Sequence, residues 1–167
     1  DQGVDLGGFS LDVSPDGLGV VFAMRGPLDD DMDEDEGPSW NIWEYNIATD
    51  TLRRVIPSDI IAEEGQDVSP HYLPDGRIVF SSTRQRQAKA ILLDEGKPQF
   101  EAQNEARDEP AFVLHVMNAD GGGIKQISFN QSHDLDATVL SNGRVLCTRW
   151  DRGPGRDGMH LYSANPD

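Results

Sequence analysis

The stretch DVSPHYLPDGRIVFSSTRQ, residues 67–85, decides the fold of this chain, because two variants of it occur elsewhere. They are SLDVSPDGLGVVFAMRG from Ser10 and HDLDATVLSNGRVLCTRWD from His133. Each version has a polar stretch that ends in Asp-Gly or Asn-Gly, and then a short apolar run. A sequence motif that recurs at such spacing is typical of repeat architectures.

Each copy predicts a strand, a tight turn and a second strand. Gly17, Gly76 and Gly143 follow Asp or Asn, and such pairs supply the positive φ angles that hairpin turns need. The apolar runs after the turns have the length and composition of buried strands. They cover residues 20–22, 78–80 and 145–147.

Later segments add a third strand to each copy and a fourth strand to two of them. The third strands are NIWEYNIATD from Asn41, FVLHVMNADG from Phe112 and MHLYSANPD from Met159. The fourth strands are TLRRVI from Thr51 and IKQIS from Ile124. Four short antiparallel strands make one propeller blade. We therefore predict an all-β partial propeller of about three blades, the last without its outer strand.

The predicted domain spans residues 1–167 and contains two insertions. Blade 1 covers about 9–56 with an acidic loop at 27–39, blade 2 about 66–128 with an insertion at 86–110, and blade 3 about 132–167. The second insertion contains the only predicted helical residues, with Gly96 ending one helical turn and Pro98 opening another. It is either a loop that decorates the rim or a contact surface for a partner.

A blade has two apolar faces and becomes stable only when neighbours cover them. Propellers close with about four to eight blades. We therefore expect the chain to be a fragment of a propeller or a half that pairs with another chain. The expected partners are the remaining propeller blades or another copy of the chain, and also a possible protein partner.

Composition excludes several classes of function. The 14 basic and 30 acidic residues give a net charge of -16, which repels nucleic acids and anionic membranes. No apolar run approaches the length of a membrane helix, so we expect neither nucleic-acid binding nor membrane insertion. The single cysteine, Cys147, stands at the strand position of Phe22 and Phe80, which predicts a buried structural thiol.

An acidic loop is one candidate for binding a hard cation. Seven of the eight residues from 29 to 36 are acidic. A weak site for Ca²⁺ or another divalent cation would use Asp29, Asp31, Asp33 and Asp35. An EF-hand loop that began at Asp29 would need glycine where Glu34 stands, so a solvated charge run is the alternative.

No catalytic motif is present, so we predict no catalytic residues and no cofactor within this segment. The chain lacks GxSxG, HExxH and the CxxCH of haem attachment. Four residues are candidates for a ligand site at the rim of the central channel: Asp67, His71, His133 and Asp134. Counted back from the turn glycine, Asp134 aligns with Asp67, and His133 aligns with Gln66.

Carboxylate and imidazole groups at one radius could bind a cation or a polar ligand. In the alternative interpretation, the two aspartates tie the loops between blades by accepting backbone N–H bonds.

The quoted motifs also resemble a known family. SPDG from Ser14, the run to Phe22 and NIWEYNIATDTLRRV from Asn41 resemble the TolB-type, WD40-like propeller repeat. The sequence of residues 67–100 and 130–146 is similar to that of bacterial proteins that carry the middle domain of the hydrazine synthase alpha subunit, and this domain is also a propeller.

The resemblance to TolB implies a non-catalytic interaction or scaffold module of a larger, exported protein, periplasmic or extracellular. The alternative is the propeller part of a multidomain redox or hydrolytic enzyme whose catalytic groups lie outside this segment. The resemblance implies that haems are attached outside the propeller, and no haem site carries over to this chain.

Overall fold

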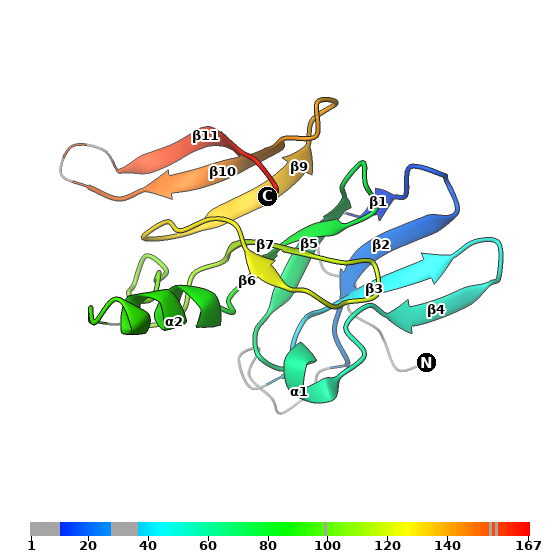
Figure 1. The fold of residues 1–167 in the computed structure, drawn as a ribbon, viewed down its shortest axis with the longest axis horizontal. Helices are drawn as coiled ribbons and strands as arrows, with labels where there is room; N and C mark the ends of the chain where they lie inside the picture. The colour runs from blue at the N-terminus through cyan, green and yellow to red at the C-terminus, as the bar shows by residue number, and fades with distance from the viewer. Residues whose placement is uncertain (1–10, 28–36, 99, 154, 156) are drawn as a thin grey trace.

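The computed structural model describes residues 11–27, 37–98, 100–153, 155 and 157–167, and it forms three antiparallel sheets (Figure 1). Blade 1 contains β1 (Asp12–Val13), β2 (Gly19–Met24), β3 (Asn41–Asn46) and β4 (Thr51–Arg54). Blade 2 contains β5 (Asp67–Tyr72), β6 (Ile78–Ser82), β7 (Val113–Met117) and β8 (Lys125–Gln126). Blade 3 contains β9 (Asp134–Val139), β10 (Val145–Asp151) and β11 (Gly158–Ala164). The predicted partial propeller is confirmed, with the third sheet one strand short.

The Asp-Gly and Asn-Gly turns adopt the expected backbone. Gly76 has a φ of 86°, and the Leu73 N–H donates to the Arg77 carbonyl across a three-residue loop. Gly143 has a φ of 80° in the same loop of blade 3. In blade 1 the equivalent bond joins Ser14 to Gly19, so this loop is one residue longer.

Within the described ranges two helices connect the strands, and one of them was not predicted. α2 (Arg86–Asp94) lies in the predicted insertion and ends before Gly96, whose φ is 66°. α1 (Asp59–Ala62) is a short helix between blades 1 and 2, capped by Ser58, whose hydroxyl accepts from the Ile61 N–H. The second helix expected after Pro98 is wrong, because the described residues from 100 to 110 form no helix.

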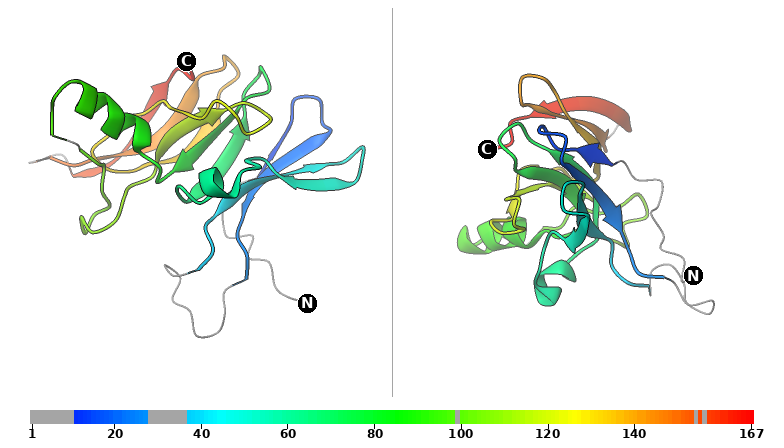
Figure 2. Two further views of the ribbon diagram at one scale, coloured as in Figure 1. Left: turned by 60° about the horizontal axis from the view of Figure 1, so that its bottom comes forward. Right: turned by 90° about the vertical axis from the view of Figure 1, so that its right-hand side faces the viewer.

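The core lies between the blades, and blade 2 stands between its two neighbours (Figure 2). Every residue of β6 and β7 is buried, so both faces of this sheet are covered. The face of Ile78 and Phe80 packs against Val21 of blade 1. The opposite face, with Val79 and Leu114, packs against blade 3. The blade 3 residues in this second cluster are Ala137, Val145 and Cys147. Blades 1 and 3 each cover one face of blade 2.

The inner strands of blades 2 and 3 share an irregularity that the sequence did not reveal. Ser69 and Asp136 stand two residues after the aligned aspartates, and each has a φ of 50°. The pairing of β5 with β6, and of β9 with β10, shifts near these residues. Such bulges bend a strand locally and redirect its side chains.

Candidate channel rim site

Asp67 begins β5, and its carboxylate lies entirely within the protein. The side chain is 0% exposed, and Ser82 Oγ donates to Oδ1 at 2.6 Å. Arg84 donates from Nε to Oδ1 at 3.1 Å and from Nη2 to Oδ2 at 2.5 Å. Burial raises the pKa of Asp67 to about 6, although the Arg84 charge and these hydrogen bonds oppose the shift. The carboxylate is therefore ionised at neutral pH and paired with an arginine.

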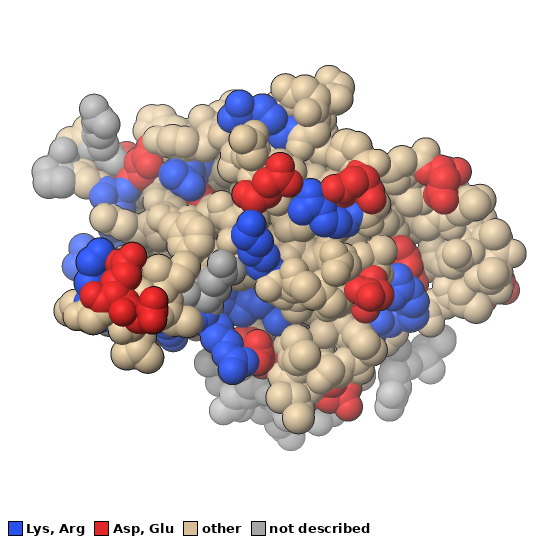
Figure 3. Space-filling model, in the orientation of Figure 1, with Lys and Arg blue, Asp and Glu red and all other residues tan. Residues whose placement is uncertain are grey.

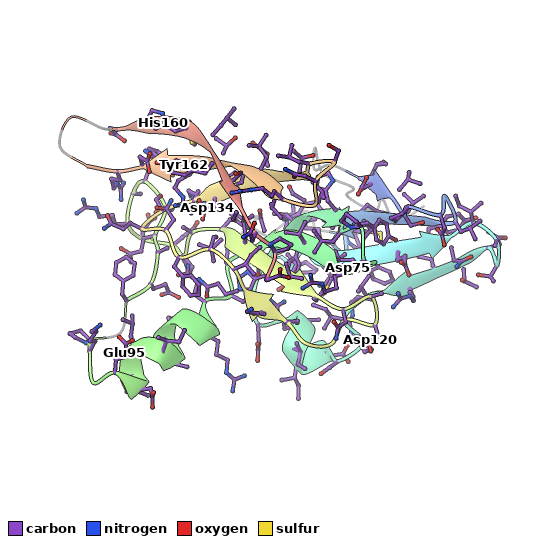
Figure 4. All side chains as sticks on the ribbon, turned by 45° about the horizontal axis from the view of Figure 1, so that its top comes forward. Asp75, Glu95, Asp120, Asp134, His160 and Tyr162 are labelled. Atoms are coloured by element: carbon purple, nitrogen blue, oxygen red, sulfur yellow. The ribbon has the colours of Figure 1, made fainter. Side chains whose placement is uncertain are left out.

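Asp134 stands at the start of β9 (Figure 4) and, like Asp67, is fully buried and paired with an arginine. It is 0% exposed, and Arg149 donates from Nε to Oδ1 at 2.7 Å and from Nη2 to Oδ2 at 3.1 Å. The guanidinium of Arg149 also lies 4.7 Å from the centre of the Tyr162 ring. Both aligned aspartates therefore hold an arginine from the second strand of their own blade, or just beyond it.

The residue pairs that begin these strands also bind the preceding blade. Gln66 Oε1 accepts from the Trp40 N–H at 2.8 Å, and the Asp67 N–H donates to the Trp40 carbonyl at 2.9 Å. His133 Nδ1 accepts from the Phe112 N–H at 3.1 Å, and the Asp134 N–H donates to the Phe112 carbonyl at 2.8 Å. We name this two-bond arrangement the inter-blade clamp.

The clamp refines the alternative interpretation of the aligned residues. The side chains of Gln66 and His133 accept hydrogen bonds from backbone N–H groups, as that interpretation expected of the aspartates. Asp67 and Asp134 instead donate their own backbone N–H groups to carbonyls of the preceding blade. The carboxylates bind arginine instead. The chemistry of this repeated pair is therefore that of joining blades.

His133 has a fixed role within the clamp. Because Nδ1 accepts a hydrogen bond, the neutral ring carries its proton on Nε2, which lies 3.9 Å from a carboxylate oxygen of Glu105. The ring also stacks on Phe112, with 6.0 Å between ring centres. Burial lowers the pKa of His133, which favours the neutral form that the clamp needs.

His71 lies apart from the other candidates, towards the other end of β5. Asp67 pairs with Ser82, whereas His71 pairs with Val79 near the turn. Its Nδ1 is 3.6 Å from Oδ2 of Asp12, which also accepts from the Tyr72 N–H. Of the four predicted rim residues, the structure therefore places His133 and Asp134 in one clamp, Asp67 in the equivalent clamp, and His71 elsewhere.

Nothing in the geometry adds support for a cation at the rim. Within the described ranges, no group of three or more His, Cys, Asp or Glu side chains is placed to hold a metal ion. The acidic candidates Asp29, Asp31, Asp33 and Asp35 lie outside the described residues. Cation binding at either place stays a prediction.

A hollow among the described residues contains none of the predicted site residues. It has a volume of about 570 Å³ and lies among α1, α2 and the β7–β8 hairpin, lined in part by Arg84, Arg86, Lys125 and His115. Several Lys and Arg side chains lie in this part of the surface (Figure 3). His115 is buried and its Nδ1 contacts the Val113 carbonyl at 3.0 Å. Burial lowers the pKa of His115 to about 4, so the ring is neutral.

Sequence reasoning missed the partners of the aligned residues. Arg84 and Arg149 stand 17 and 15 residues after their aspartates, so their spacing differs between the copies. Trp40 and Phe112 contribute only backbone groups to the clamp, which any residue type except proline could supply. The usable signals were the aligned aspartates and the alignment of His133 with Gln66.

Comparisons with known proteins identify the fold class. No protein family model and no curated protein matches the chain. Among solved structures, TolB from Acinetobacter baumannii superposes over 93% of this chain at 15% identity, with a TM-score of 0.58. Putative TolB from Agrobacterium tumefaciens superposes over 88% at 19% identity, with a TM-score of 0.55. The chain therefore has the TolB-like β-propeller fold.

Hydrazine synthase from Kuenenia stuttgartiensis is similar in the same way, over 94% of this chain at 18% identity and a TM-score of 0.63. The chain spans only part of each solved protein: 29% and 40% of the two TolB chains and 24% of the hydrazine synthase chain. Among the described residues, no helix is long and apolar enough to cross a membrane.

Proposed function

We propose that this chain is a non-catalytic propeller segment that acts as an interaction or scaffold module of a larger, exported protein. The observation that carries the proposal is the use of the aligned polar residues in contacts between blades. Gln66 and His133 each accept a backbone N–H from the preceding blade, and Asp67 and Asp134 donate their own backbone N–H groups to it. The carboxylates of the two aspartates are paired with arginines within their own blades.

The outer faces of the blade stack support a binding role. Met159 and Leu161 on β11 are 50% and 71% exposed, and they lie opposite Trp150 and Thr148 of β10. On the equivalent face of blade 2, Val79 and Leu114 are buried by blade 3. An apolar sheet face of this kind is stabilised when a neighbour covers it. The remaining blades, another copy of the chain or a protein partner would do so.

An exported location, periplasmic or extracellular, follows from the resemblance to TolB. The likeness to hydrazine synthase favours one alternative, in which the segment is the propeller part of a multidomain redox or hydrolytic enzyme. In that case the catalytic groups lie on other segments. A reading frame that encodes CxxCH or a hydrolase domain next to this segment would support the alternative, and their absence would remove it.

Site-specific photo-crosslinking of the full-length protein tests the interaction role. A crosslinking amino acid at Leu161 is expected to attach to another propeller segment or a partner protein, and mass spectrometry identifies the attached peptide. The matched control is Ile60 on α1, which is 81% exposed but lies on a short helix outside the sheets. Equal crosslinking at both positions would contradict the proposal, as would turnover that is lost when residues of this segment are changed.

A further inference from the structure

We propose that the open edge of β11 binds a further propeller repeat through a third inter-blade clamp, centred on the backbone of Met159. This inference rests on the proposed function and specifies its partner. The partner is a strand that is followed by a hydrogen-bond-accepting side chain and then Asp, the pair found in Gln66-Asp67 and His133-Asp134.

Strand register identifies Met159 as the equivalent of the two clamped residues. Ile42 pairs with Ala23, Leu114 with Ser81, and Leu161 with Thr148. These three pairs occupy the same place in their blades. The carbonyl that closes the hairpin turn belongs to Gly19, Arg77 or Arg144, and Ala23, Ser81 and Thr148 each stand four residues after it. The clamped residue stands two positions before the first member of each pair: Trp40, Phe112 and, in blade 3, Met159.

The segment that precedes each acceptor–Asp pair also supplies the outer strand of the preceding blade. In blade 1 the Val55 N–H donates to the Ile42 carbonyl at 2.9 Å, and in blade 2 the Ile127 N–H donates to the Leu114 carbonyl at 2.8 Å. Each outer segment then leads to the acceptor–Asp pair that completes the clamp. β11 is the edge strand of its sheet, so Leu161 and Met159 offer the corresponding backbone groups to an incoming strand.

A second copy of this chain does not satisfy the requirement with its blade 1. Counted back six and seven residues from the turn position of Ser14, as Asp67 and Gln66 are from Leu73, the sequence has Gly8 and Gly7. Glycine has no side chain to accept the Met159 N–H. The proposed occupant is therefore a repeat with an acceptor–Asp pair and not blade 1 of another copy.

The experiment extends the chain with its own clamp. Asn165-Pro166-Asp167 corresponds to Asn118-Ala119-Asp120, so a copy of residues 121–134 placed after Asp167 continues blade 3 in register. A control tail replaces the copied His and Asp with two glycines. Hydrogen exchange of the Met159 amide, followed by NMR, is compared among the original chain and the two extended chains, and sedimentation velocity gives their oligomeric state.

The clamping tail is expected to slow exchange at Met159 about tenfold relative to the original chain, the change that a hydrogen bond of ~1.4 kcal/mol produces. The glycine tail should not slow it. Equal slowing by both tails would show strand pairing without a clamp, which overturns this inference but leaves the interaction role intact. A dimer of the original chain with Met159 already protected would also overturn it, since a second copy would then cover the edge.

Discussion

Replacing Arg84 with Met should expose the energetic role of the buried Asp67–Arg84 pair. The substitution leaves the Asp67 carboxylate fully buried with Ser82 as its remaining side-chain donor. Removal of one member of a buried ion pair costs about 3–5 kcal/mol of unfolding free energy, because the other charge stays uncompensated. The double variant Asp67→Asn/Arg84→Met removes that charge, so it should recover at least about half of the loss.

The loss should also depend on pH, with a sign fixed by the pKa of Asp67. Burial already raises this pKa to about 6 from 3.8, and Arg84 opposes the shift, so Arg84→Met raises the pKa further. An acid with a raised pKa binds more protons in the folded state, so stability falls as pH rises from its unfolded pKa to its folded pKa. Arg84→Met should therefore be closer to the original chain at pH 5 than at pH 8.

Urea unfolding followed by tryptophan fluorescence measures both effects, since Trp40 and Trp150 lie in blades 1 and 3. Lys97→Met is the matched control, because Lys97 is exposed and pairs with the exposed Glu95, and it should change stability by less than about 0.5 kcal/mol. The reasoning is refuted if Arg84→Met costs less than about 1 kcal/mol at pH 7, or if the double variant is no more stable than Arg84→Met.

Two further predictions concern close packing and a buried base. Gly121→Ala should lower the free energy of unfolding by at least ~3 kcal/mol, because Gly121 has a φ of 81° and the added Cβ would lie 2.1 Å from the Val55 carbonyl oxygen. The control Gly96→Ala should lower it by only about 1 kcal/mol, because Gly96 has a φ of 66° but open space around it. Equal melting temperatures of the two variants would contradict this prediction. Burial lowers the pKa of His115 to about 4 from 6.5, so the folded state binds fewer protons than the unfolded state between these pH values. The stability that the neutral His115 ring contributes is therefore fully present above pH 6.5 and is lost as pH falls towards 4, by up to ~1.4 kcal/mol per pH unit. The difference between His115→Gln and the original chain should therefore shrink from pH 7 to pH 4.5 in urea titrations, and a constant difference would exclude the shift.

Local signals predicted much of the fold. A positive φ at Gly17, Gly76 and Gly143 depends on the residue itself, so turns and the strands that follow could be placed from sequence. The predicted burial of the apolar runs holds throughout only for residues 78–80 of blade 2, since Val20, Phe22 and Leu146 are only partly buried. α1 escaped notice because four residues carry too little periodicity to indicate a helix. The rim site was only partly predictable: alignment found Asp67 and Asp134, but it placed them in a ligand site and did not find their arginines.

The sequence by itself determined that three similar sheets follow one another, because a repeated turn and strand pattern is encoded within each copy. Only the tertiary structure decided what the aligned polar residues do. The bond between His133 and the Phe112 N–H joins residues 21 positions apart, and the bond between Gln66 and Trp40 joins residues 26 apart. Such partners meet only when blades stack, so the clamp is a property of the packed sheets and not of any one repeat.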